Sequence, residues 1–520
     1  MDSQAMILSV LVRMGQTAIE CTPTLAVGLL VAAILRRMVG AAGTRRLFGG
    51  NGLGGLVRAW FIGSLLPVCS LGVIPVAREM VRAGVPWPTV LAFVLAAPQL
   101  NPLSFLYGLT LSEPTVIIIF VLVTMLIAVA GGELWSRVFS PGEPEPVCGE
   151  EAMPPPGLGR LCLVFVTASR ETVGANLPYC VASVMATGLL AGLIPHGALS
   201  TTMRHDSWLS TPLMTLVGSA LYSGVLQGMM RVGLIFEHGN STGAAFALFA
   251  VGVGMNLGLV AWLVFSKGPR MLGWLALVLG IVILAGWTMD KTLYFAEEEA
   301  SHTHAFDDWT SPFPGGSGAG WAEVWNKWVQ KAEVLEPVAI ALLLIQGLVG
   351  VLLQGLDGKK RLEGWLCRPR SAQGGKESIF NRGVPGPILG LVALTGLVLF
   401  SLVSLYIYYP PAEEVFNEIS RVRADALTSV RTGKTQDAIR QLEAWDLLTR
   451  KLQVGEFLRK GLLNKQQSEK AEALREELEA MRDDLLAGDL QAARGKIITV
   501  ENAHNLCRES FIMVKYREER

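Results

Sequence analysis

The sequence predicts an all-α polytopic membrane protein with internally duplicated transmembrane units that contain broken helices, followed by a soluble helical bundle. Hydrophobic residues make up 51% of the 520 residues, charged residues make up 17%, and the mean hydropathy is +0.43. Such values are typical of a membrane-spanning chain that carries a soluble part. The formal net charge is zero, so we expect no nucleic-acid partner.

An apolar stretch over residues 63–102 is the part around which the chain is organised. Each freed backbone N–H and C=O in lipid needs an internal partner, so broken helices are tolerated only where protein or a watered cavity surrounds them. Transporters often present backbone groups to their substrate in this way. The alternative is a set of kinked helices that small residues pack closely together. The helix-breaking residues in the stretch are Pro67, Gly72, Pro75, Pro98 and Pro102.

The stretch recurs once, 155 residues further along the chain. Prolines, glycines and an asparagine keep this single offset without a gap through the whole unit. A repeat of this kind is the sequence mark of many secondary transporters, and it predicts two related transmembrane units. The matched pairs include Pro23 with Pro178, Gly63 with Gly218, Ser64 with Ser219, Gly84 with Gly239, Asn101 with Asn256, and Pro114 with Pro269.

The same residues carry a family resemblance. The run PVCSLGVIPVAREMVRAGVP, followed by LAFVLAAPQLNP, resembles the signature of the ArsP-like predicted permeases, a family that includes organoarsenical efflux proteins. The resemblance covers about residues 14–290 and implies a permease, with arsenical transport as a family-level option. Relatives commonly have Cys-Ser-Cys-Gly, whereas Leu71 follows Cys69 and Ser70 here, so one of the paired thiols is missing. The second-half run SALYSGVLQGMMRVGLIF contains no cysteine.

The remaining spans follow along the chain in order. Each predicted span is long enough to cross a bilayer, and the proline-rich, acidic linker between the two units predicts solvated coil. The spans are expected at 16–38, 114–138, 175–194, 334–356 and 387–408, with an amphipathic lead-in at 161–171. The expected domains are 1–140 (first permease repeat), 141–160 (linker), 161–291 (second repeat), 292–410 (extra spans and loops) and 411–520 (bundle).

Basic residues predict the orientation of the chain in an inner membrane. The loop 357–383 is rich in Lys and Arg, which places it in the cytoplasm and both ends of the chain, with the bundle, outside. Two paths stay open for residues 56–81. If this segment crosses the membrane, each unit has four spans and the repeats are parallel; if it returns as a re-entrant hairpin, each unit has three spans and the repeats are inverted. The total is eight to ten spans, and the charge distribution favours the inverted arrangement.

From residue 412 onward, the composition changes to that of a soluble domain. Apolar residues recur at three- and four-residue spacing, and Gly433, Gly461 and Gly488 separate the runs as favoured helix-stop residues. We therefore predict four helices in an antiparallel bundle. A protein partner is a more natural role for it than catalysis, because no acid–base or metal constellation stands out.

The broken stretches supply the candidate substrate-binding residues. Cys69 and Ser70 lie between two helix breakers, where a thiol and a hydroxyl could line a cavity. Asn101 and Asn256 occupy matched positions, where each amide could contact the substrate or cap freed backbone groups. The full predicted set is Cys69, Ser70, Gly72, Pro75, Asn101, Pro102, Ser223, Gln227 and Asn256.

Ionisable residues in or near the apolar spans are further functional hypotheses, because burying charge in a membrane is costly. They are Glu20, Glu79, Arg231 and Glu237. The apolar spans of the duplication contain no Asp, so a dedicated proton relay is not evident and the energy source is not indicated.

Metal and cofactor sites are not expected. The seven cysteines are scattered, without CxxC or zinc spacing. The outer-loop residues His302, His304, Asp307 and Asp308 favour solvation over metal binding, and His504 with Cys507 favours core packing. Motifs for nucleotide binding and hydrolysis are missing, so we predict no catalytic residue, cofactor or enzyme activity.

These observations predict a permease in the lipid bilayer that moves a small solute by alternating access at the interface of the repeats. Efflux of a metalloid or organoarsenical-type compound is the option that the family resemblance adds. The alternative is a membrane-anchored sensor or assembly protein, with a degenerate permease part and a partner-binding outer bundle. The eroded second-half motif keeps this alternative open.

Overall fold

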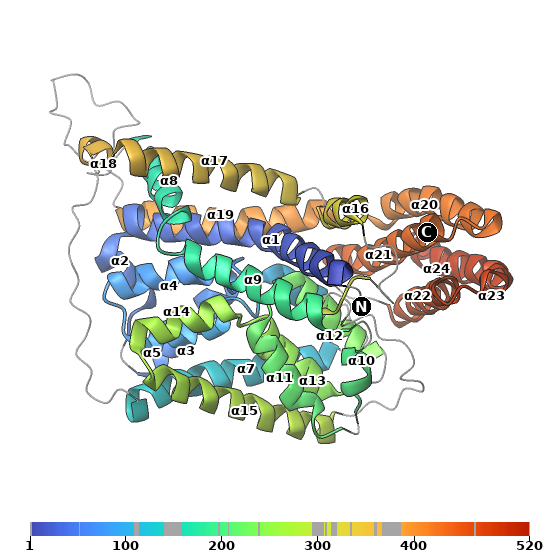
Figure 1. Cartoon of the computed structure of the whole chain (residues 1–520), viewed down its shortest axis with the longest axis horizontal. Helices are drawn as coiled ribbons and strands as arrows, with labels where there is room; N and C mark the ends of the chain where they lie inside the picture. Colours follow the sequence, from blue (N-terminus) through green and yellow to red (C-terminus); the bar gives the residue numbers. More distant parts are fainter. Residues whose placement is uncertain are drawn as a thin grey trace. The chain divides into compact units, whose positions relative to one another are not determined.

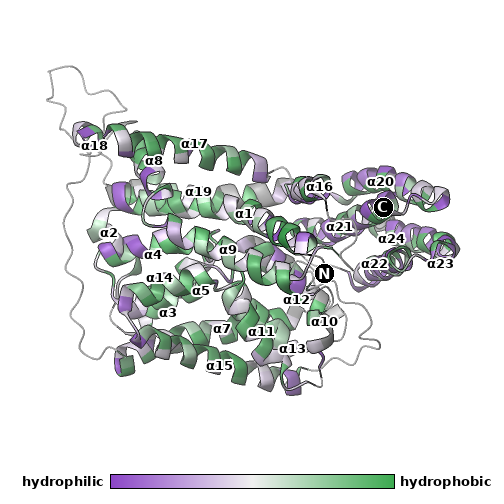
Figure 2. Ribbon diagram, viewed as in Figure 1, coloured by the Kyte–Doolittle hydropathy of each residue, from purple (hydrophilic) through white to green (hydrophobic). Residues whose placement is uncertain are grey.

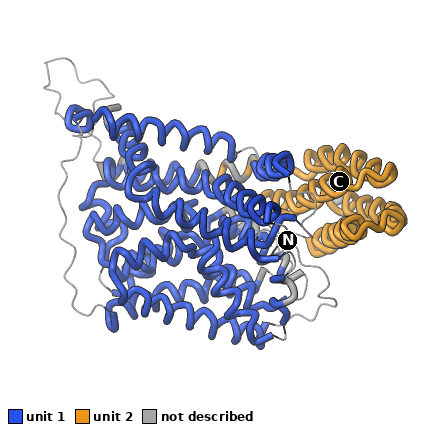
Figure 3. The backbone as a smooth tube through the Cα atoms, in the orientation of Figure 1, with its two compact units in different colours: residues 1–108, 115–399 blue, residues 109–114, 400–520 orange. Residues whose placement is uncertain are grey.

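A computed structural model gives the arrangement of the chain, and every regular element in its described part is a helix (Figure 1). The chain divides into two compact units, residues 1–108 with 115–399 and residues 109–114 with 400–520 (Figure 3). Each unit is considered by itself below. The structure describes residues 3–50, 52–108, 114–139, 158–195, 198–205, 207–237, 240–293, 306, 309–313, 320–332, 335–357, 361–366, 386–461 and 464–518.

The helices of the two predicted repeats begin at corresponding positions. Adding 155 carries the first residue of α1 onto that of α8, and likewise α5 onto α13 and α6 onto α14. The first run is α1 (Ser3–Ile34), the π-helical η1 (Leu35–Val39), α2 (Gly40–Phe48), α3 (Leu53–Leu65), α4 (Val73–Arg82), α5 (Trp87–Ala96), α6 (Pro102–Gly108), α7 (Pro114–Leu134) and η2 (Trp135–Phe139). The second is α8 (Leu158–Thr172), α9 (Leu177–Leu193), α10 (Ala198–Thr202), α11 (Ser210–Ala220), α12 (Val225–Glu237), α13 (Thr242–Ala247), η3 (Leu248–Gly252), α14 (Leu257–Lys267) and α15 (Arg270–Thr292).

Four further helices follow the second run, namely α16 (Trp321–Lys331), α17 (Leu335–Leu356), α18 (Arg361–Leu366) and α19 (Gly386–Tyr408). The predicted span at 387–408 lies in α19, and the amphipathic lead-in at 161–171 lies in α8. Most of the linker at 141–160, and most of the basic loop at 357–383, lie outside the described residues.

Several helices are long and apolar enough to cross a membrane, as the sequence predicts. In the described part of the chain, four helices do so singly, and two bent pairs raise the number to six if each pair is one span. Figure 2 shows apolar colour along α7, α15 and α17. The single helices are Ser3–Phe48, Thr115–Phe139, Arg270–Thr292 and Glu336–Leu356, and the pairs are Arg160–Thr172 with Leu177–Leu193 and Thr242–Gly252 with Leu257–Lys267.

The first helix is longer than the predicted span, which began at residue 16. Its N-terminal turns carry Ser9 and Arg13, which hydropathy alone would exclude from an apolar span. Both side chains are buried and find partners in the segment that precedes α16: the hydroxyls of Ser9 and Ser311 are 2.9 Å apart, and Arg13 donates to the Thr310 carbonyl. Tertiary contacts therefore extend the helix to Ser3.

Helices α3 and α4 leave and return to the same end of α1 and are here called the first hairpin, a path that favours the re-entrant alternative for residues 56–81. Arg58, near the start of α3, donates to the carbonyls of Arg46 and Gly49, which follow α1 in the chain. Helix α4 returns to the same end, where its Glu79 lies 4.0 Å from Arg36. The tip of this first hairpin, residues 66–72, therefore lies inside the first unit, beside α1.

Helices α11 and α12 form a second hairpin that enters from the opposite end of α1. Arg204 and Asn240, just outside its two arms, pair as an isolated β-bridge. The tip, residues 221–224, reaches Glu20, while Arg231 further along α12 packs on Trp309, next to the residue that binds Arg13. The arms thus run toward the start of α1, whereas those of the first hairpin run toward its end.

Two further helices are broken, α5–α6 and η3–α14, and their breaks lie close to the hairpin tips. The side chain of Gln99, in the break between α5 and α6, donates to the Ala250 carbonyl at 2.7 Å, just before the break between η3 and α14. Trp87 at the start of α5 stacks on Trp262 of α14, with ring centroids 6.1 Å apart. Helices α5 and α14 therefore lie antiparallel, and the four breaks gather in the middle of the unit.

The second unit contains the predicted helical bundle, with one short helix in addition to the four that were expected. Its helices are α20 (Ala412–Thr432), α21 (Thr435–Lys460), α22 (Lys465–Leu486), the short α23 (Leu490–Gly495) and α24 (Ile497–Glu518). Gly433, Gly461 and Gly488 have φ of 73°, 74° and 82°, which confirms them as helix stops. His504 and Cys507 are buried in the core with Trp445, as expected for packing.

Candidate substrate site at the helix breaks

The tip of the first hairpin carries a buried thiol and a buried hydroxyl. Cys69 and Ser70 are both 0% exposed, and the Gly72 N–H donates to Cys69 Sγ at 3.3 Å. Ser70 Oγ has no hydrogen-bond partner among the described residues. Pro75 is buried in the first turn of α4, where a missing N–H costs nothing.

A glycine contact brings this tip against α1. A methyl group placed on Gly28 would lie 2.2 Å from the Gly72 carbonyl oxygen, so the two backbones touch directly. Any side chain at either position would force the tip away from α1. The predicted role of Gly72 as a helix breaker is therefore joined by a packing requirement that the sequence did not reveal.

The second tip meets the first in the middle of the unit. Its Tyr222 side chain lies near Cys69, with a buried hydroxyl that has no hydrogen-bond partner among the described residues, and the Tyr222 N–H donates to Thr187 of α9 at 2.9 Å. The Gly224 N–H donates to Glu20 Oε1 at 2.5 Å. Ser223 is fully buried and accepts a hydrogen bond from Arg231 at 2.7 Å. The tips thus bring a thiol, two hydroxyls and a phenol to one place.

Two further thiols lie near Cys69. Cys21 of α1 and Cys180 of α9 are close enough to Cys69 to interact with it electrostatically. Neither was in the predicted set. A signal was available, because each lies two residues from one of the matched prolines, Pro23 and Pro178. Among the described residues, no group of three or more His, Cys, Asp or Glu could hold a metal ion.

The matched asparagines both cap helices. Asn101 Oδ1 accepts from the Ser104 N–H at 2.7 Å in α6, which Pro102 begins, and Asn256 Oδ1 accepts from the Leu259 N–H at 3.0 Å in α14. Each uses the third helical residue, the usual geometry of an asparagine cap. Asn256 Nδ2 is buried and, in the part of the chain that the structure describes, has no hydrogen-bond partner.

A cluster of polar side chains, here called the Glu20 cluster, adjoins the second tip. Its members are Glu20, Ser223, Gln227, Arg231 and Lys331. Lys331 of α16 donates to Gln227 at 2.6 Å and lies 3.5 Å from Glu20. The sequence pointed to all of these residues except Lys331, which lies outside the duplication at the end of α16. Glu237, the other ionisable candidate of α12, has a side chain outside the described set.

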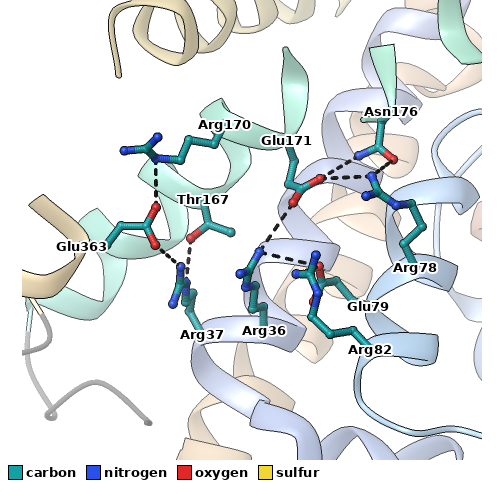
Figure 4. Close-up of polar contacts among 10 residues, drawn as sticks. All are labelled: Arg36, Arg37, Arg78, Glu79, Arg82, Thr167, Arg170, Glu171, Asn176 and Glu363. Carbon is teal, nitrogen blue, oxygen red and sulfur yellow. Dashed lines mark hydrogen bonds and ion pairs between the residues drawn. The ribbon is translucent and has the colours of Figure 1, made fainter. Parts of the chain in front are cut away.

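An ion-pair network lies toward the other end of α1 (Figure 4). Arg36 is 3.5 Å from Glu171 of α8 and 4.0 Å from Glu79 of α4. Arg37 and Arg170 both contact Glu363 of α18. The network therefore ties the first hairpin to the second run of helices and to α18. Figure 4 draws its members, which are Arg36, Arg37, Arg78, Glu79, Arg82, Thr167, Arg170, Glu171, Asn176 and Glu363.

The Glu20 cluster, the hairpin tips and the ion-pair network form three polar layers along α1. Glu20 and Arg36 are sixteen residues apart, which is about 24 Å in a helix. The hairpin tips lie between them, beside Cys21 and Gly28. Such an arrangement can bind a small molecule at the tips while a polar layer closes each side. The predicted outer-loop residues His302, His304, Asp307 and Asp308 lie outside the described residues.

Broken helices at the centre of a helical membrane protein are an architecture that many transport proteins share. The chain belongs to the ArsP_1 family of predicted permeases, whose model matches residues 7–290. Over 85 residues it is 31% identical to the UPF0718 protein YcgR of Bacillus subtilis (strain 168). That match covers 16% of this chain and only 29% of the relative's length. No solved structure matches the chain.

Proposed function

We propose that this multi-pass membrane permease moves a small solute across the inner membrane by alternating access, and that the solute binds between the two hairpin tips. The supporting observation is the meeting of Cys69 with Tyr222 beside the hydroxyl of Ser70, which has no hydrogen-bond partner among the described residues. A buried polar atom without a partner is rare in proteins and is favourable only where something else satisfies it. A bound solute or water would do so.

Alternating access needs a barrier on each side of the bound solute. In this proposal the ion-pair network closes the arginine-rich end of α1, and the Glu20 cluster closes the other end. Separating a buried ion pair without hydration costs several kcal/mol, so each barrier opens only as water enters. The excess of arginines beyond Arg36 favours the cytoplasm for that end, and hence an extracytoplasmic bundle.

The thiol of Cys69 at the first tip favours a soft electrophile as the solute. Thiolate sulfur prefers soft partners, and the family resemblance adds efflux of a trivalent organoarsenical-type compound. The relatives' second thiol is replaced by Leu71, so the hairpin itself offers one thiol, Cys69.

Flux measurements in proteoliposomes test the proposal. We expect uptake of a trivalent organoarsenical into inverted vesicles by the unaltered chain, and loss of most of it in Cys69→Ser. Cys162 of α8 is exposed, so Cys162→Ser is the matched control and should transport normally. Equal flux in both variants would show that the solute does not bind at the hairpin tips. No flux of any tested solute would favour the membrane-anchored sensor or assembly protein.

A further inference from the structure

Helix α16 packs one of its faces on the N-terminal part of α1. Val324 is 1% exposed in a small core with Leu8 and Val12. The Trp328 indole N–H donates to the Val12 carbonyl at 3.2 Å, and the ring covers Gly15, where a methyl group would lie 2.1 Å from the indole nitrogen. This face therefore has its partner, and it fixes how α16 is rotated about its axis.

A second face of α16 is apolar and uncovered. Trp321, Trp325 and Val329 recur every four residues and are 68%, 64% and 53% exposed. We call these three residues the tryptophan stripe. Asn326 and Gln330 are also exposed and lie one residue, or about 100° of helix rotation, beyond members of the stripe. The exposed half of the helix is thus divided lengthwise into an apolar strip and a polar strip.

The stripe adjoins a surface that lipid must cover. Helix α17 begins at Leu335, four residues after α16 ends, and only 17% of its most apolar window is buried inside the chain. Figure 1 shows α16 foreshortened while α17 runs lengthwise, so the two helices are inclined to one another. With 11 residues, about 16 Å, α16 is too short to cross a bilayer.

We propose that α16 is a membrane-surface helix, with its tryptophan stripe in the boundary between lipid headgroups and acyl chains. Tryptophan favours this boundary, because its ring is apolar and its indole N–H is polar. The polar strip then faces water, as in other interfacial amphipathic helices. Since Lys331 of the same helix contacts Glu20 and Gln227, the Glu20 cluster lies just below the membrane surface. The family model ends at residue 290, so this helix is an addition to the matched region.

Spin-label accessibility in the full-length protein tests this placement. The protein is placed in nanodiscs of phosphatidylcholine and phosphatidylglycerol, after the substitutions Cys148→Ser, Cys162→Ser, Cys180→Ser and Cys367→Ser. A nitroxide is attached to Trp325→Cys or to its neighbour Asn326→Cys. We expect the label at 325 to collide severalfold more with oxygen than with water-soluble nickel(II) ethylenediaminediacetate, and the label at 326 to show the reverse preference.

A second neighbouring pair guards against a local effect of losing one tryptophan. Val329→Cys and Gln330→Cys should give the same contrast as the first pair. Equal nickel accessibility at 325 and 326, and at 329 and 330, would mean that the stripe faces water. Protection of 325 and 329 from both reagents would mean that protein, such as a second copy of the chain, covers the stripe. Either result would overturn the proposal.

Discussion

The two hairpins occupy corresponding places in the fold but carry different chemistry. The first tip has a thiol, Cys69, and its return arm α4 is held by the carboxylates and arginines of the ion-pair network. The second tip has a phenol, Tyr222, and rests on the carboxylate of Glu20 through a backbone N–H. Its arm α12 carries Arg231, which contacts the hydroxyl of Ser223 and the ring of Trp309.

This difference teaches that the backbone path and the chemistry of a repeat are specified separately. The breaks recur at a fixed offset because prolines and glycines recur, whereas the side chains at the tips are free to diverge. We infer that the first tip selects the solute and that the second tip completes the site. The experiments below test this division of roles, from the largest expected effect on transport to the smallest.

Exchanging side chains at the two tips is the most direct comparison. Cys69→Ser should lower the initial rate of organoarsenical flux at least about tenfold, equivalent to about 1.4 kcal/mol, because the soft ligand is lost. Ser223→Ala should lower it less, since only a hydrogen bond from Arg231 disappears. Vesicle flux, normalised to the amount of protein in the membrane, measures both. A larger loss in Ser223→Ala would reverse the assignment of roles.

Weakening the network around the first hairpin should loosen one barrier. Glu171→Gln removes the negative partner of Arg36 and Arg78, which lie 3.5 Å and 3.4 Å away. Losing this carboxylate weakens the network around the first hairpin, which should favour the state open at that end. Cys69 should then react faster with a membrane-impermeant thiol reagent added from the arginine side. Glu133→Gln is the control, because its partner Arg137 is 76% exposed. Equal rates in both variants would argue against a barrier there.

Altering the support of the second tip should have a smaller effect. Glu20→Gln keeps an oxygen for the Gly224 N–H but removes the charge opposite Lys331. We expect a severalfold loss of flux, and the same loss in Lys331→Met, without addition in the double variant, because both changes remove one interaction. Lys327→Met, which breaks a pair with Glu323 and a contact with the Phe313 ring but leaves the charge opposite Glu20 in place, serves as the control. Losses that add would show that Glu20 and Lys331 act independently.

The C-terminal bundle lies outside both hairpins and serves as a comparison. We expect acid to lower its folding stability, and we expect substitutions of its acid-sensitive groups to leave flux at neutral pH unchanged. Burial alone would raise the pKa of Asp446, but Arg450 and Arg475 lower it to about 2 from 3.8. The unfolded chain therefore binds this proton first, and folding stability falls as the pH drops from about 4 to about 2. The expected loss is about 2 kcal/mol. Urea unfolding of residues 411–520 measures this loss. In Asp446→Asn, the free energy of unfolding should lack this contribution to its pH dependence.

A second acid-sensitive group in the bundle should act at higher pH. Burial, together with Arg423 and Arg508, lowers the pKa of His504 from 6.5 to about 4. The unfolded state again takes up its proton first, so stability falls as the pH drops from about 6.5 to about 4 and is constant above that range. His504→Gln should remove this slope. A slope that persists in the variant would assign the acid sensitivity to another group.

Local sequence signals predicted the elements of the fold well. Proline and glycine positions marked the breaks at 66–72 and 97–101, and the single offset of 155 placed their counterparts. Glycine stops marked the helices of the bundle. These features could be predicted because helix breaking depends on the backbone of the residue itself and not on distant partners.

The candidate site was less predictable, because it depends on contacts between distant segments. Ser223 and Gln227 were expected, but Lys331 reaches them from a helix outside the duplication. Cys21 and Cys180 lie in continuous apolar helices, where a cysteine resembles any small hydrophobic residue. The ion-pair network was equally hidden, since residues such as Arg36 and Glu171 look like ordinary charges at the ends of spans.

The glycine contacts have a mechanical consequence. Where two backbones touch without side chains, neither can slide without opening a gap, so the helices that they join must travel together. Gly28 joins α1 to the first tip, whereas Gly218 with Gly252 and Gly243 with Gly286 join α11, η3, α13 and α15. Each of these contacts therefore fixes the close packing around one of the tips. If access alternates as proposed, we expect the tips to part at the surface between Cys69 and Tyr222.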